Sequence, residues 1–430
     1  MTTAIPLSLL ADTAAVEPDG SLSIGGCSVT ELAATYGTPL FVYDETHLRA
    51  RCREAVAAFG HQSVVYAAKA FLCRAMAKLA YDEGMLLDVS TGGELHVALA
   101  AGVPGNACVM HGNNKSVDEL RAAITAGVRH IVVDSFDEMD RLDALHSDGL
   151  HSDGLAVPDV LLRITPGVHA HTHEFIATGQ DDSKFGFNLG NGDAMRAVDR
   201  ARHSASIHLV GLHCHIGSNV FAANNFAKAA EVMANFAAPL DLPELVLGGG
   251  LGVAYTNGEE APTIGQWGSV LLDACSALGV RARVSVEPGR AIVASAALTL
   301  YTVGTIKTIP GVRTYVAVDG GMSDNPRPVL YGSGYEAFLP RDVRAERSAK
   351  VRLVGKHCES GDVLIFDASV PEGIVVGDTI ATPVTGAYGH SMGSNYNKVT
   401  RPPVVFVADG VARLVVRRET YGDLLACDLG

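Results

Sequence analysis

The sequence predicts an α/β protein with two domains, a (β/α)8 barrel and a second all-β domain. Between about residues 60 and 290, apolar β-type runs alternate with alanine-rich helical stretches, the pattern of a parallel sheet. From about Leu298 the chain changes to β-rich segments separated by Gly, Pro and Asp turns. A chain of 430 residues also exceeds what one compact core holds. We therefore expect a barrel over 46–298 and a second domain formed by 1–45 with 299–430.

Eight strands are expected in the barrel, each ending in or near a polar or small residue. Their ends fall near Ala68, Asp88, His111, Asp134, Arg163, His213, Gly248 and Glu287. Because the carboxyl ends of barrel strands share one mouth, where active sites lie, these side chains should converge.

The second domain is expected from strand-like segments such as Leu298–Val303 and Val404–Ala408. Two early segments, Ser21–Ile24 and Pro39–Tyr43, also resemble strands and are expected to join it. One perfect repeat, HSDGL over 146–150 and 151–155, predicts a duplication in a surface loop.

Composition excludes several classes of function. A formal charge of -14 and a pI near 5.5 disfavour nucleic acid and anionic membranes, which both favour a basic face. Residues 1–20 carry no basic segment before an apolar stretch, and no apolar run approaches the roughly 20 residues of a membrane span. A cytoplasmic location is expected.

No metal site or disulfide framework is expected. The eight cysteines show no CxxC spacing. His213 with His215, and His169, His171 and His173, look like ligand groups, but the usual ligand spacings of zinc sites are absent.

Lys69 closes the apolar run Ser63–Phe71, which places an amine at the end of a buried strand. Desolvation would lower its pKa and make it a nucleophile for Schiff-base chemistry. The alternative is a lysine that extends to the rim as ordinary strand punctuation.

Two further motifs suit a cofactor. Glycines 248–250 follow the seventh strand, where backbone N–H groups can surround a phosphate, although a tight βα turn fits equally. Glu287-Pro-Gly-Arg290 ends the eighth strand, where a carboxylate can keep a pyridine nitrogen protonated, or can form a structural ion pair. With Lys69 they form three parts of one pyridoxal phosphate (PLP) site.

Seven segments in order along nearly the whole chain carry a resemblance. They are Tyr66-Ala-Ala-Lys69, His213-Cys-His215-Ile-Gly-Ser218, Gly248-Gly-Gly250, Glu287-Pro-Gly-Arg290, Asn325-Pro-Arg327-Pro-Val-Leu-Tyr331, Cys358-Glu-Ser-Gly-Asp362 and Gly386-Ala-Tyr388. Together they resemble the diaminopimelate decarboxylase family, within the alanine-racemase-like PLP enzymes. The resemblance implies the same barrel and C-terminal β domain.

The resemblance also implies roles for residues. Lys69 is the lysine that binds PLP covalently, and His215 stacks on the ring. Asp88 is the second-strand carboxylate near the lysine, although Asp at a strand end also suits a hydrogen-bonded turn. The implied cofactor-binding residues are Lys69, Asp88, His215, Ser218, Gly248, Gly249, Gly250, Glu287, Pro288, Gly289, Arg290 and Tyr388.

For the substrate, the resemblance implies that Arg290, Arg327 and Tyr331 bind the far carboxylate, where arginine's fork suits a planar anion. Glu359 meets the far ammonium. Cys358, by composition alone an inert packing residue, is the implied proton donor. The family supplies Cys358 and Glu359 across a homodimer interface, and Tyr388 contacts both cofactor and substrate from the same region.

The implied reaction is decarboxylation of meso-2,6-diaminopimelate to L-lysine and carbon dioxide. Decarboxylases of ornithine, arginine or carboxynorspermidine remain alternatives, although Arg327 and Tyr331 disfavour those with simple diamine products. An amino-acid racemase would contact the pyridine nitrogen with arginine, which Glu287 disfavours. A non-catalytic PLP-binding homologue is the third alternative.

Overall fold

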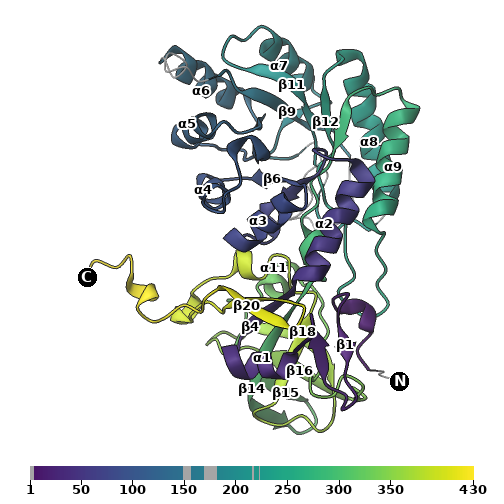
Figure 1. The fold of residues 1–430 in the computed structure, drawn as a ribbon, viewed down its shortest axis with the longest axis vertical. Coiled ribbons are helices and arrows are strands. Elements are labelled where there is room, and N and C mark those ends of the chain that lie inside the picture. Colours follow the sequence, from purple (N-terminus) through teal and green to yellow (C-terminus); the bar gives the residue numbers. More distant parts are fainter. Residues whose placement is uncertain (1–3, 149–155, 169–181, 216, 222) are drawn as a thin grey trace. The chain divides into compact units, whose positions relative to one another are not determined.

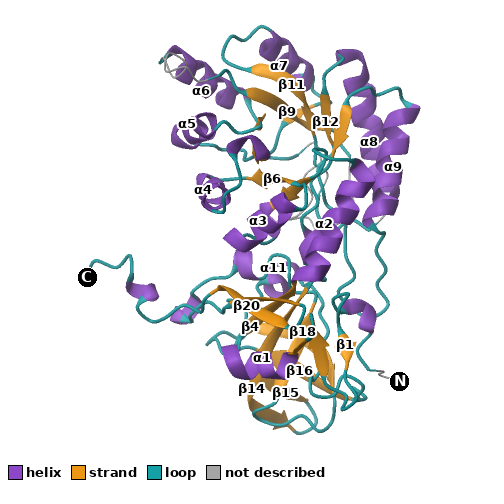
Figure 2. Cartoon of the chain, viewed as in Figure 1, coloured by secondary structure: helices purple, strands orange, loops and turns teal. Residues whose placement is uncertain are grey.

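The computed structural model describes residues 1–430 apart from 1–3, 149–155, 169–181, 216 and 222. The described chain forms two compact units. The barrel unit contains Cys52–Gly252 and Ala261–Ala291, and the β unit contains Met1–Arg51, Val253–Glu260 and Ile292–Gly430. Figure 2 shows how they differ in kind, because helices surround the strands of one unit and strands dominate the other.

A parallel sheet closes into the predicted barrel. Its described strands, in sheet order, are β5 (Val65–Ala67), β6 (Leu86–Val89), β7 (Cys108–Met110), β8 (His130–Val133), β9 (Asp159–Thr165), β11 (His208–His213), β12 (Glu244–Val246) and β13 (Arg283–Ser285). The short β10 (Phe187–Asn188) pairs with β9. Val65 N donates to Val286 O and Val286 N to Ser63 O, both at 2.9 Å, so the last strand meets the first. The barrel prediction is confirmed, and each expected strand end lies within two residues of the observed one.

Helices alternate with these strands around the outside of the barrel (Figure 1). They are α2 (Glu45–Phe59), α3 (Arg74–Asp82), α4 (Gly92–Ala100), α5 (Val117–Ala126), α6 (Phe136–Ser147), α7 (Asp193–Arg202), α8 (Ala223–Ala237), α9 (Ile264–Ala277) and the single turn α10 (Arg290–Val293). Several begin at a side chain that accepts from the first turn, for example the capping box of Ser116 with Glu119. These caps satisfy backbone N–H groups at the starts of those helices.

The β unit is built on an eight-stranded mixed sheet in the order β17-β16-β15-β14-β4-β19-β20, with β18 also paired to β14. The strands are β4 (Leu40–Asp44), β14 (Ala297–Ile309), β15 (Arg313–Val318), β16 (Ala349–Val354), β17 (Val363–Val370), β18 (Thr379–Pro383), β19 (Val404–Ala408) and β20 (Val411–Val416). The unit also contains α1 (Val29–Tyr36) and α11 (Arg327–Tyr331), so it is mostly rather than wholly strand.

The two early segments both form strands of the β unit, in different sheets. Pro39–Tyr43 corresponds to β4, which lies between β14 and β19, so that part of the prediction is confirmed. Ser21–Ile24 corresponds to β2 (Leu22–Ile24), which also belongs to the β unit as expected, in a separate antiparallel sheet with β1 (Ala15–Val16) and β3 (Cys27–Ser28). The Gly25-Gly26 turn, with both φ positive, returns the chain at once into a local hairpin.

Most of the duplicated pentapeptide is not described by the structure. Residues 149–155 of the duplicated pentapeptide lie outside the described residues, and His146 lies in the last turn of α6. Over the ranges that the structure covers, no helix combines the length and the apolar character needed to cross a bilayer.

Candidate active site

Lys69 lies on η2 (Ala68–Ala70), a 3-10 turn directly after β5. Its Nζ is 3.4 Å from Oδ2 of the buried Asp88 on β6. The side chain of Lys69 is 47% exposed, so the expectation of a lysine kept from water at a strand end is wrong. The turn directs the side chain out of the buried run, and Asp88 is the carboxylate beside its amine.

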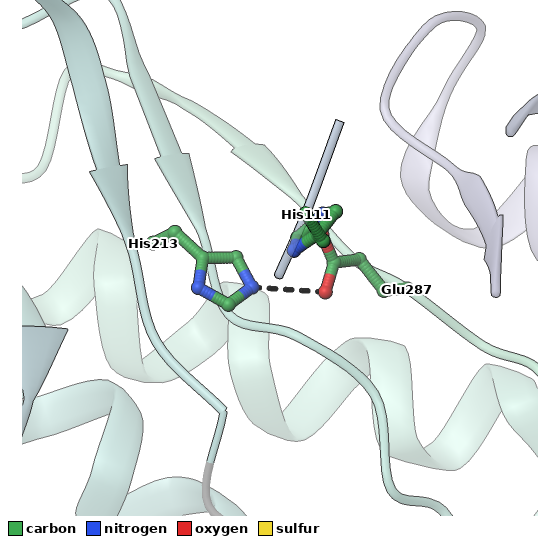
Figure 3. A group of neighbouring side chains, drawn as sticks. All are labelled: His111, His213 and Glu287. Atoms are coloured by element: carbon green, nitrogen blue, oxygen red, sulfur yellow. Dashed lines mark hydrogen bonds and ion pairs between the residues drawn. The ribbon is translucent and has the colours of Figure 1, made fainter. Parts of the chain in front are cut away.

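Three strand ends place His111, His213 and Glu287 against one another (Figure 3). His213 Nε2 is hydrogen-bonded to Glu287 Oε2 at 2.9 Å. His111 Nε2 lies 2.9 Å from Oε1, but the two groups are not aligned for a hydrogen bond, and Oε1 has no hydrogen-bond partner. The imidazole rings meet edge to face, with centroids 5.0 Å apart. All three side chains are almost inaccessible to solvent, which confirms convergence at these strand ends.

Charge in this cluster resides on the carboxylate. Burial acts to raise the pKa of Glu287, but the imidazoles of His111 and His213 oppose it and hold that pKa well below its usual range. Burial lowers the pKa of His213. A neutral His213 therefore donates from Nε2 to an ionised Glu287.

His215 and the glycine segment are linked through the backbone. Gly249 N–H donates to His215 Nδ1 at 3.2 Å, and burial, with the nearby charges of Lys69 and Arg163, holds the pKa of His215 well below its usual range. The ring is therefore neutral and carries its proton on Nε2. A Cβ on Gly249 would lie 2.0 Å from Glu287 O, and one on Gly250 2.1 Å from Gly217 O, so a side chain cannot fit at either position.

The segment after β13 closes the same mouth. Pro288 O accepts from Ala67 N at 3.1 Å, which joins the ends of the last and first strands. A Cβ on Gly289 would lie 2.9 Å from Ala67 Cβ. Arg290 is buried, and its Nη2 donates to Ser218 Oγ at 2.9 Å. The guanidinium of Arg290 and the hydroxyl of Ser218 thus form one pair of hydrogen-bonding groups in the barrel unit.

In the β unit, aromatic rings surround Arg327 at the start of α11. Its guanidinium carbon is 4.2 Å from the ring centroid of Tyr255 and 5.4 Å from that of Tyr335. Arg327 Nη1 also donates to the Tyr335 hydroxyl. Tyr331 ends α11 and is half-buried. The buried Arg327 is therefore held in a fixed direction by two tyrosines that the sequence analysis did not identify.

Cys358 and Glu359 are exposed on a loop that is anchored by its neighbour His357. His357 Nε2 is 2.8 Å from Ser323 Oγ, and Asn397 Oδ1 lies 3.2 Å from both His357 Nδ1 and Cys358 N. This arrangement fixes the backbone that carries the thiol. Glu359 Oε2 accepts a hydrogen bond from the Tyr396 hydroxyl at 3.1 Å.

Tyr388 has a left-handed backbone conformation, with φ at 61°. This conformation is uncommon for a bulky residue and is often found at functional sites. Nearby, a Cβ on Gly386 would lie 1.8 Å from Val293 O, so the turn requires glycine.

The residues expected from the sequence divide between the two units. The barrel unit brings together Lys69, Asp88, His215, Ser218, Gly248, Gly249, Gly250, Glu287, Pro288, Gly289 and Arg290. The β unit holds Arg327, Tyr331, Cys358, Glu359 and Tyr388. The sequence analysis noted His111 and His213 only as strand ends, and found no signal for Tyr255, Tyr335 or Asn397.

His111, His213 and Glu287 are the group among the described residues that could hold a metal ion. Zinc accepts such a donor set. Histidines 169, 171 and 173, considered in the sequence, lie outside the described residues.

Comparison with known proteins identifies the family of this chain. The model of the pyridoxal binding domain of pyridoxal-dependent decarboxylases matches residues 45–294. The diaminopimelate decarboxylase of Mycobacterium tuberculosis strain H37Rv is 48% identical over 430 residues, covering 95% of each chain. That of Bacillus subtilis strain 168 is 46% identical over 425 residues, again covering 95% of each chain.

Solved structures agree. Diaminopimelate decarboxylase from M. jannaschii, determined in co-complex with L-lysine, superposes with a TM-score of 0.89 at 32% identity, covering 97% of this chain and 98% of that one. The Helicobacter pylori enzyme, also complexed with L-lysine, gives 0.85 at 31%, covering 92% and 98%. A barrel mouth with a lysine and a buried carboxylate, together with the matching domain model, defines a PLP-dependent decarboxylase. The chain belongs to the diaminopimelate decarboxylase family.

The residues present fit PLP. Glu287 is a buried, ionised carboxylate whose Oε1 has no hydrogen-bond partner, which suits the N–H of a protonated pyridine. The same mouth carries an amine on Lys69 and a backbone turn that admits only glycine at Gly249 and Gly250.

Proposed function

We propose that this chain decarboxylates meso-2,6-diaminopimelate to L-lysine and carbon dioxide. The observation that carries the proposal is the buried Glu287 with an acceptor oxygen left over, at the mouth that also holds Lys69. Both the relatives' names and the lysine found with two of the solved relatives support this substrate.

Bound PLP would supply an aldehyde for the substrate's amine and a protonated pyridine ring as the sink for the electron pair released on decarboxylation. Lys69 holds the cofactor through Nζ and returns to that position at product release. Asp88, 3.4 Å away, stabilises the amine while it is protonated. Glu287 keeps the ring nitrogen protonated, and His215 stacks on the ring. Gly248, Gly249 and Gly250, with Ser218 and the 287–290 segment, bind the phosphate end.

Residues of the β unit recognise the substrate's far end. Arg327, with Arg290 and Tyr331, binds the far carboxylate, since a guanidinium matches it with two parallel hydrogen bonds. Glu359 pairs with the far ammonium. Cys358 Sγ delivers the proton that replaces carbon dioxide at the α carbon, and Tyr388 contacts both cofactor and substrate.

The proposal includes a cytoplasmic homodimer in which Cys358 and Glu359 complete the site of the other subunit. The exposure of both side chains on an anchored loop supports this arrangement. Simple diamine decarboxylases are the second candidate, and a far-carboxylate group built around Arg327 disfavours them.

Lys69→Ala provides the test. The variant should lose carbon dioxide release from diaminopimelate and the borohydride-reducible adduct on residue 69, both measured on protein purified with PLP. Lys78→Ala, which removes an exposed lysine paired with Asp82 on α3, is the matched control and should keep both. An intact adduct on another lysine would overturn the assignment. Equal turnover of ornithine and diaminopimelate by the native protein would overturn the substrate.

A further inference from the structure

The carboxylate expected to face the cofactor ring is itself supported by two imidazoles. Glu287 follows β13, His213 ends β11, and His111 follows β7, so three separate strands supply the cluster. No motif used to recognise the family includes His111, and His213 enters only as the start of the segment that carries His215. Their placement has to be explained by what they do to Glu287.

We propose that His213 and His111 are positioning residues that hold the Glu287 carboxylate as the anionic acceptor for the ring nitrogen of PLP. The inference rests on the proposed function and deepens it. Neither histidine is assigned contact with substrate or cofactor.

Geometry gives the two histidines different parts. His213 Nε2 bonds Glu287 Oε2 at 2.9 Å and so fixes the plane of the carboxylate. His111 Nε2 stands 2.9 Å from Oε1 and 3.8 Å from Asp88 Oδ1, between the carboxylate for the ring and the one beside Lys69. Because a carboxylate offers about four lone-pair directions, Oε1 keeps capacity for a further donor after His213 is satisfied.

Electrostatics explains why a histidine stands at each oxygen. A buried carboxylate without donors would take up a proton and lose its charge, and a neutral acid could not keep the pyridine nitrogen protonated. The neutral imidazole of His213 supplies an N–H donor to Oε2 without adding a competing positive charge, and the ring of His111 lies beside Oε1. Arg163, also buried in this unit, carries a positive charge that interacts with Glu287.

The test compares PLP with its 1-deaza analogue, in which a C–H replaces the ring nitrogen, as ligands of the apoprotein in equilibrium dialysis. Wild-type protein should bind PLP at least about tenfold more tightly than the analogue, since only PLP makes the charged hydrogen bond. His213→Leu should bring that ratio close to one. His213→Gln, which keeps an N–H donor near the position of Nε2, should restore most of it. In a Glu287→Gln background, His213→Leu should change PLP affinity less than about twofold.

A matched control exists in the same barrel. His130, at the amino end of β8, is also buried beside a carboxylate, with Nε2 3.7 Å from Glu244 Oε2. His130→Leu should leave the PLP-to-analogue ratio unchanged, even if the protein melts at a lower temperature. Should His213→Leu fail to fold, His213→Asn, which withdraws the donor from Oε2 while staying polar, replaces it.

The outcomes separate this inference from the function beneath it. Absence of the reducible adduct on Lys69 in wild-type protein would overturn both. An adduct with the same ratio in wild type and His213→Leu would overturn only the positioning role. One equivalent of Zn²⁺ retained by the apoprotein, and lost on His213→Leu, would assign the cluster to a metal and also overturn it.

Discussion

Tyr335→Phe deletes a single hydroxyl, the one that accepts a hydrogen bond from Arg327 Nη1. Both rings that flank the guanidinium stay in place, so the variant removes orientation and leaves the charge. A hydrogen bond to a charged group contributes about 1.5–3 kcal/mol. Because the freed N–H can still reach the substrate's carboxylate, we expect the lower end, which is about a tenfold rise in KM for diaminopimelate. Turnover at saturation should change little.

Tyr255→Leu extends the same argument. The ring of Tyr255 lies 4.2 Å from the guanidinium carbon, and such a contact away from water contributes about 2 kcal/mol. We therefore expect about a thirtyfold loss of kcat/KM. Carbon dioxide release would be measured with diaminopimelate and with lysine, which has no far carboxylate.

The relative loss of activity on diaminopimelate and on lysine tests whether the two tyrosines act through Arg327. Both variants should reduce the preference for diaminopimelate over lysine, because only the former uses Arg327. Tyr315→Phe removes a hydroxyl outside this group and serves as the control. Equal losses on both substrates, or a loss of PLP binding, would refute the role of the two tyrosines.

Three further predictions concern the β unit and the subunits. Burial raises the pKa of Asp324 to about 7 from its ordinary 3.8, so the folded protein binds a proton there that the unfolded chain has released. Its contribution to stability is full below about pH 4 and is lost as the pH rises through about 7. Between pH 4 and 8, the free energy of unfolding of Asp324→Asn, measured by urea titration, should therefore rise relative to that of wild type by up to about 4 kcal/mol. The same dependence of unfolding free energy on pH in both proteins would contradict this. Asn397→Ala removes the acceptor beside Cys358 N and should lower kcat about tenfold at constant KM in steady-state kinetics, whereas a raised KM alone would argue against a role in proton delivery. Mixing the inactive Lys69→Ala and Cys358→Ala proteins and allowing their subunits to exchange should restore about one quarter of wild-type activity. Half of the random dimers then contain one subunit of each kind, and each of these has one intact site out of two. No recovery would exclude sites completed by the partner.

The barrel could be predicted from sequence because it depends on short-range patterns. Each strand is a run of apolar residues, and the residue at its end marks the mouth whatever the neighbouring strands do. Asp88, His213 and Glu287 were therefore placed correctly at one end. The sequence did not say which sheet of the β unit Ser21–Ile24 would join, since strand propensity does not specify the partners of a strand.

Contacts between distant segments explain what the sequence could not give. Tyr255 and Tyr335 are 80 residues apart and meet only at Arg327, so no local spacing signals the pair. The exposure of Lys69 was one of two alternatives that the sequence left open, for a related reason. One 3-10 turn redirects its side chain, and hydrophobic periodicity does not report such a turn.

These corrections change how the barrel site is understood to work. Lys69 is half-exposed, and the carboxylate of Asp88 lies 3.4 Å from its amine. Burial acts instead on Glu287, where it makes charge costly unless donors are supplied. The protein therefore combines an accessible lysine after the first strand with a buried anion after the last strand, which is its neighbour in the closed barrel. His111 lies between them, 3.8 Å from Asp88 Oδ1 and 2.9 Å from Glu287 Oε1, so a change at either carboxylate should be felt at the other.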